Sequence, residues 1–142
     1  MLPSIYDDDL VQDFTITKYP THTYRLHFAK EPSVGRFEGA EAMKQAIYLI
    51  LNCERYDHEM FSWDYGAELS DLIGQQNDSI LRLDIEKRVT EALLADDRIS
   101  DVTDFNFVKD RDKLTVTFTA ITTEGDIESQ LIWWGDGFEV KT

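Results

Sequence analysis

Residues 114–134 read LTVTFTAITTEGDIESQLIWW, a segment in which apolar and polar side chains alternate on both sides of a turn. Apolar residues occupy the even positions from 114 to 120, and threonines lie between them. A period of two residues is typical of a β-strand with one buried face. The Thr-Glu-Gly-Asp sequence at 123–126 is rich in turn formers, and the alternation resumes from Ile127 to Trp133. The segment therefore predicts two antiparallel strands joined by a turn.

Strand patterns also flank this segment. Phe105 and Phe107 share one face of an earlier strand, and the polar residues 109–113 turn the chain back toward residue 114. After the Gly-Asp-Gly sequence at 135–137, Phe138 and Val140 again lie two residues apart. The last third of the chain is therefore expected to form an antiparallel meander.

The middle of the chain has a helical period instead. From Gly39 to about Cys53, apolar residues recur at helical spacing and form one stripe, and a short second pattern at 69–73 stops at Gly74. A third pattern begins after Asn77 or Asp78, and its apolar side consists of Leu81, Ile85, Val89, Ala92 and Leu93. About three helices followed by strands predict an α+β fold, with the helices packed on one face of the sheet.

The chain has 142 residues, the size of one ordinary domain. Residues 1–22 are interpreted as an extended N-terminal arm, and alternation over 23–29 predicts a strand with Tyr24, Leu26 and Phe28 on one face. Residues 23–123 then form the main α+β domain, and 124–142 add a C-terminal strand extension to the same domain. We expect a single folded unit.

The formal net charge is −14, from 28 acidic and 14 basic residues. Such a charge repels nucleic-acid phosphates and anionic bilayers, so neither is an expected partner. The first residues show no targeting signal, and no segment has the length of an apolar membrane span. An acidic surface suits both a basic protein partner and simple solubility, and the charge alone does not separate these two roles.

The sequence ERYDHEMFSWDYG at 54–66 is dense in carboxylates and aromatic residues. Two of the four acids in this stretch could form the carboxylate pair of a glycosidase: Glu54, Asp57, Glu59 and Asp64. Clustered acids beside a helix end are more often solvated or paired with arginine. The three histidines show no metal-ligand spacing, Cys53 lies at an apolar helix end where a thiol stays protonated, and no phosphate-binding glycine motif occurs. We therefore expect no catalytic residue, no metal and no cofactor.

A structural role for this stretch is the favoured interpretation. Arg55 is expected to satisfy helix-end carbonyls or a carboxylate, while Glu54 accepts hydrogen bonds from nearby backbone N–H groups. Gly66 would allow two backbones to approach closely. The aromatic residues would pack this corner onto the sheet: Tyr56, Phe61, Trp63 and Tyr65.

The same region resembles a known family. A Glu-Ala-x-x-Gln-Ala-Ile sequence at 41–47 is followed by the Glu-Arg pair, the aromatic loop and Tyr-Gly-x-Glu-Leu-x-x-Leu-Ile-Gly at 65–74. In this order the features resemble the central segment of the XkdS-like proteins of PBSX-type prophages. Those proteins resemble the lysozyme-like baseplate wedge family of contractile phage tails, also called sheath initiators. The Glu-Pro-Arg motif of that family falls on Glu54-Arg55, without the proline.

The resemblance implies a non-enzymatic baseplate subunit of a contractile phage tail or tail-like bacteriocin, assembled in the host cytoplasm. It would join wedge proteins to the tube or hub proteins and nucleate the sheath by binding its first ring of subunits. Relatives offer a small sheet to which sheath strands add, which is main-chain pairing at an open edge. The threonine-rich strand 114–122 could supply such an edge, with Thr115, Thr117 and Thr119 as candidate partner-binding residues, and the sequence leaves open which strand is outermost.

Adjacent tryptophans on a strand point to opposite faces, so one of Trp133 and Trp134 should enter the core. The other, taken here as Trp134, belongs either to the core or to a partner-binding surface. Two other functions stay open on the residues alone. One is a peptidoglycan-cleaving tail lysozyme that uses two of the four acids, and the other is a free acidic protein-binding module.

Overall fold

The computed structural model describes residues 21–26, 35–75, 78–134 and 136–142. Its main element is a four-stranded antiparallel sheet in the order β3-β4-β5-β6. The strands are β3 (Ile99–Asp110), β4 (Lys113–Thr122), β5 (Gly125–Trp134) and β6 (Gly137–Lys141). Each strand pairs with the next one along the chain, as the alternating pattern predicts. The expected meander is therefore confirmed.

The strand order shows which strands lie at the edges of the described sheet, a point that the sequence left open, and it removes β4 as a candidate. β4 pairs with β3 on one side and β5 on the other, so its backbone is not open to a further strand. Thr115, Thr117 and Thr119 lie half-exposed on one face of an interior strand. Alternation reveals which side chains share a face, but it carries no information on which strand is outermost. Within the described sheet the edges are β3 and β6.

The described residues contain two α-helices rather than three, α1 (Gly39–Asn52) and α2 (Asp78–Leu94). The third predicted helix is a single 3-10 turn, η1 (Ser70–Leu72). The apolar pattern at 69–73 covers little more than one helical turn, which is too short to propagate an α-helix. Gly74 follows with a positive φ of 89°, the conformation expected from its place at the end of the pattern.

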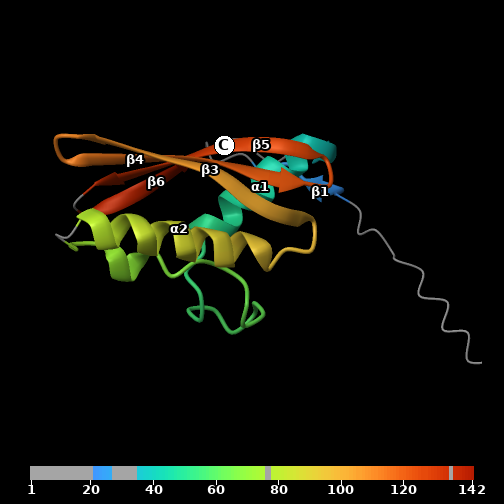
Figure 1. Cartoon of the computed structure of the whole chain (residues 1–142). Coiled ribbons are helices and arrows are strands. Elements are labelled where there is room, and N and C mark those ends of the chain that lie inside the picture. Colours follow the sequence, from blue (N-terminus) through green and yellow to red (C-terminus); the bar gives the residue numbers. More distant parts are fainter. Residues whose placement is uncertain (1–20, 27–34, 76–77, 135) are drawn as a thin grey trace, which may run out of the picture.

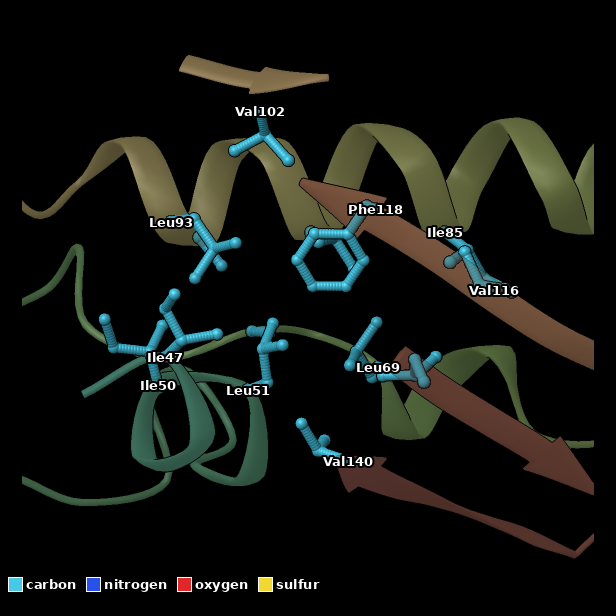
Figure 2. Close-up of a cluster of buried hydrophobic side chains, with 14 of the residues drawn as sticks. Ile47, Ile50, Leu51, Leu69, Ile85, Leu93, Val102, Val116, Phe118 and Val140 are labelled. Atoms are coloured by element: carbon cyan, nitrogen blue, oxygen red, sulfur yellow. The ribbon is translucent and has the colours of Figure 1, made fainter. Parts of the chain in front are cut away.

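Both helices lie on the same side of the sheet (Figure 1). α2 packs along β3, while α1 packs against α2 and against β5 and β6. Figure 2 shows the side chains of this layer converging from both helices, from Leu69 and from β3, β4 and β6. The inward residues of β4 and β5 are buried there, and Trp133 is the tryptophan that enters the core. The predicted α+β class is thereby confirmed.

A small hairpin precedes α1, and its first strand covers only the start of the strand predicted at 23–29. β1 (Thr23–Tyr24) pairs with β2 (Arg36–Phe37), whereas residues 27–29, and residues 1–20 of the arm predicted over 1–22, lie outside the described residues. Tyr24 is 68% exposed and Leu26 is 40% exposed, so these two residues of the expected apolar face do not enter the core, and Phe28 lies outside the described residues. The buried Gln45 side chain holds the hairpin instead, because its amide donates to the Tyr24 carbonyl at 2.8 Å and accepts from the Leu26 N–H at 2.9 Å.

Candidate functional site

The segment between α1 and η1 forms a loop closed by a backbone clamp. The Ala67 N–H donates to the Cys53 carbonyl at 2.9 Å, and the Arg55 N–H donates to the Ala67 carbonyl at 3.3 Å. These two bonds form a short parallel bridge between Glu54 and Ala67. Figure 1 shows the green loop 56–65 extending from this base on the side of α2 away from the sheet.

Gly66 is required by the closeness of the two backbones at the clamp. A Cβ atom at this position would lie 2.6 Å from the Cys53 carbonyl oxygen and 3.1 Å from the Arg55 nitrogen. The residue also has a φ of 98°, which side-chain-bearing residues rarely adopt. Both features restrict the position to glycine.

Glu54 and Arg55 fasten the clamp from opposite sides. Glu54 Oε2 accepts hydrogen bonds from the Ser70 hydroxyl at 2.8 Å and from the Ser70 N–H at 3.4 Å, which ties the loop base to η1. Arg55 Nε donates to the Gly66 carbonyl at 3.3 Å. This carbonyl lies at the C-terminal end of the loop and not at the end of α1, so the Arg55 side chain joins the two ends of the loop.

An ion network continues from Arg55 to α2. Arg55 Nη1 lies 3.9 Å from Glu68 Oε1, and Arg88 Nη1 of α2 lies 4.0 Å from Glu68 Oε2 and 3.8 Å from Asp71 Oδ2. Arg88 also donates to the Glu68 carbonyl. The roles of Glu68, Ser70 and Arg88 were not predicted from the sequence, because their partners are distant along the chain. The Glu in the Tyr-Gly-x-Glu-Leu pattern was the available signal for Glu68.

The aromatic residues of the loop were expected to pack onto the sheet, but most of them are exposed. Trp63 is 81% exposed and Tyr56 is 64% exposed, and Phe61 and Met60 are exposed as well. Of the four predicted aromatics, only Tyr65 packs partly against the core. The clamp explains the difference, because it closes the loop at residue 66 and returns the chain to the core only at Ala67.

The other predicted partner-binding residues lie on the sheet. Trp134 is half-exposed at the end of β5, and Lys113 Nζ lies 5.7 Å from its ring centre. Register places Thr115, Thr117 and Thr119 opposite Ile132, Gln130 and Glu128 on the face away from Trp133. The structure thus separates these residues from the 54–66 loop, and their contact with a partner stays a prediction.

The surroundings of Cys53 determine whether its thiol can act as a nucleophile. Burial raises the pKa of the Cys53 thiol, and the negative charges of Asp57 and Glu54 raise it further. The thiol is therefore protonated at neutral pH and a poor nucleophile. Across the residues that the structure describes, no three His, Cys, Asp or Glu side chains are grouped to hold a metal ion. Neither described α-helix is long and apolar enough to cross a bilayer.

A second ion pair lies where α2 turns into β3. Arg98 donates from Nε and Nη2 to the two Asp96 carboxylate oxygens at 2.9 and 2.7 Å, and its N–H donates to Oδ1 at 3.0 Å. Burial raises the pKa of Asp96, but these hydrogen bonds and the Arg98 charge outweigh it, so the pKa lies below its ordinary value. Asp96, Arg98, Ser62 and Tyr65 line a hollow of about 380 Å³ between this turn and the loop.

Comparison with known proteins gives two matches. The family model for the contractile injection system sheath initiator matches residues 17–125, which contain α1, the clamp, α2, β3 and β4. The chain is also similar to the phage-like element PBSX protein XkdS of Bacillus subtilis strain 168. The two are 31% identical over 131 residues, which cover 90% of this chain and 92% of that protein.

The clamp predicts a strong effect of Gly66→Ala. The added methyl group would meet the Cys53 carbonyl at 2.6 Å, and the backbone would have to move. We expect a loss of about 3 kcal/mol or more in the free energy of unfolding, measured by urea denaturation. Gly74→Ala is the matched control, because Gly74 has a φ of 89° but open space around it. It should cost only roughly 1–2 kcal/mol, and equal losses in the two variants would contradict the clamp.

The Asp96–Arg98 pair predicts an acid-dependent part of stability. Because the folded-state pKa of Asp96 is lowered, its contribution is fully present above the ordinary aspartate pKa and is lost as the pH falls through the folded value. Asp96→Asn should lower the free energy of unfolding by roughly 1–2 kcal/mol at neutral pH, and by progressively less in acid. Thermal denaturation across this pH range measures the difference. Asn at the exposed neighbour Asp97 should leave the pH profile unchanged.

Proposed function

The chain belongs to the contractile injection system sheath initiator family, and we propose that it is the baseplate subunit on which sheath assembly begins. In this role it joins wedge proteins to the tube or hub and receives the first ring of sheath subunits, without catalysing a reaction. The observation that carries the proposal is the family match over residues 17–125. Its place is the baseplate of a phage tail or tail-like particle.

The sheet supports this role through an edge that an incoming strand could extend. Of the two edges, β3 is irregular, with register shifts between Ile99 and Asp101 and between Thr103 and Asn106. Bulges of this kind hinder pairing with a further strand. β6 pairs with β5 through five successive residue pairs without a shift. β6 is therefore the edge that we propose for the sheath strand.

The direction of the β6 backbone groups follows from its register. Trp134 pairs with Gly137 across a connection of only two residues, so this pair must exchange its own hydrogen bonds. Alternation then directs the N–H of Glu139 toward β5 and the N–H of Val140 toward the open edge. An incoming strand would bond to Val140, whose side chain remains in the core.

A hollow lies next to the end of β6 and offers room for the side chains of such a strand. It measures about 530 Å³ and lies between β6, α1 and the N-terminal hairpin. Its apolar lining includes Leu26, Phe37, Tyr48 and Val140, and Glu41, Lys44 and Lys141 line it as well. An added strand would receive main-chain bonds from β6 and side-chain contacts from this hollow, the two components of strand addition.

Deletion of the gene from the operon that encodes the particle tests the assembly role. We expect negative-stain electron microscopy to show naked tubes, or tails without baseplate and sheath, because nucleation of the sheath has been removed. Supplying the gene in trans should restore sheathed particles. Normal contractile particles that merely fail to breach cell walls would overturn the proposal and favour a tail lysozyme.

The β6 edge is tested by two substitutions at one position, supplied in trans to the deletion strain. Val140→Ala and Val140→Pro both remove side-chain packing, at a cost of roughly 2 kcal/mol for alanine, but only proline removes the N–H that faces the open edge. We expect sheathed particles with alanine and unsheathed tubes with proline. Thermal denaturation of both purified variants checks that each still folds. Sheath assembly with the folded proline variant would exclude β6 as the edge.

A further inference from the structure

The exposed loop beyond the clamp contains a hollow that the proposed strand addition does not use. It measures about 290 Å³, and its walls come from within the loop itself: Tyr56, His58, Glu59, Phe61, Ser62 and Trp63. Three of these side chains are aromatic rings other than histidine, and one is a carboxylate. The loop thus brings aromatic rings and a carboxylate to one concave surface.

The rings hold one another in place. Tyr56 and Trp63 meet edge to face with 5.9 Å between ring centres, and His58 and Phe61 meet in the same way at 5.9 Å. Phe61 also stacks on the half-buried Tyr65 at 4.6 Å, which connects the hollow to the core. The loop backbone adds two turns, in which Phe61 N–H donates to the His58 carbonyl at 3.2 Å and Tyr65 N–H to the Ser62 carbonyl at 3.1 Å. The hollow is therefore formed before any partner arrives.

The backbone of Tyr56 has an uncommon conformation. Its φ is 70°, in the left-handed region that bulky residues rarely adopt. Such a conformation persists where the surroundings impose it, and here Arg55 is held on one side by the clamp. This backbone brings the Tyr56 ring to Trp63 rather than to the core.

The chemistry of the hollow matches a cation. Ring faces carry negative electrostatic potential and attract cations, and Glu59, which also lines the hollow, supplies a carboxylate. Asp57 and Asp64 are exposed in the same loop, and the chain as a whole has a net charge of −14. An apolar ligand would desolvate Glu59 without compensation, whereas a cation would be paired.

We propose that this hollow binds an arginine side chain presented by a basic segment of a partner protein. A guanidinium is planar and stacks on aromatic faces while donating to a carboxylate, which suits walls made by Tyr56, Phe61 and Trp63 beside Glu59. The proposal rests on the proposed function only for placing the partner in the same particle. The binding itself requires no other component of the particle, so it can be measured on the isolated chain.

Nuclear magnetic resonance titration of the full-length, isotope-labelled chain tests the site. The probe is N-acetyl-arginine amide, compared with N-acetyl-citrulline amide, which has the same shape without the charge, and with N-acetyl-leucine amide. We expect saturable shifts with arginine alone, confined to the amides of residues 56–63 and the Trp63 indole. Higher salt should weaken binding, because part of the attraction is between charges.

Variants locate the binding on the hollow. Trp63→Ala and Glu59→Gln should each weaken arginine binding about fivefold or more, because each removes one of the two attractions. Glu128→Gln is the matched charge control, since Glu128 is exposed on β5, outside the loop. It should leave binding unchanged. Both loop side chains are exposed, so the variants should fold, and the amide spectrum verifies this directly.

Three results would overturn the proposal. One is the absence of shifts with arginine, and another is shifts spread over the acidic surface and insensitive to Trp63→Ala. The third is equal response to citrulline or leucine, which would make the hollow an apolar pocket. None of these depends on sheath assembly, so failure here leaves the deletion experiment, and the assembly role it tests, unaffected.

Discussion

The close approach of the Cys53 carbonyl to Gly66 is the constraint on which the middle of the molecule depends. α1 ends at Asn52, and the chain must reach the core again at Ala67 and Leu69, both fully buried. The bridge between Glu54 and Ala67 meets both requirements with two hydrogen bonds, and it excludes residues 56–64 from the core. Glu54, Arg55 and Arg88 then link the bridge to η1 and α2, so the clamp also sets how the helical layer is joined.

The elements with a long and regular pattern could be predicted from the sequence. The helical stripe from Met43 to Leu51 and the alternation from Leu114 to Ala120 each span several periods, and each matches a buried face. The strand order could also have been deduced, because a meander places its first and last strands at the edges and leaves β4 inside. The threonine content that made 114–122 a candidate edge describes a face of the sheet and not the position of the strand within it.

Other features depend on contacts that no local pattern contains. The helix expected at 69–73 is reduced to one 3-10 turn, since Leu69 and Leu72 are fixed by burial rather than by helical propagation. The hairpin of β1 and β2 is positioned by the distant Gln45. At the site, the kinds of hydrogen bond that Glu54 and Arg55 form were predicted, but the residues that they bind were not. The aromatic density of the loop suggested burial, whereas the clamp leaves these residues in solvent, where they surround a hollow.

The geometry separates two surfaces that a connecting subunit would need. The open edge of β6 belongs to the sheet, and the aromatic loop extends on the opposite side of the helical layer (Figure 1). Occupation of one surface therefore leaves the other accessible. The surfaces also differ in what they recognise, because β6 offers main-chain groups to any extended strand, while the loop offers rings and carboxylates to a particular side chain. The two proposed sites are therefore compatible with simultaneous occupation by an extended strand and a basic partner. This arrangement suits a subunit that must hold its place in a baseplate while the next component is added.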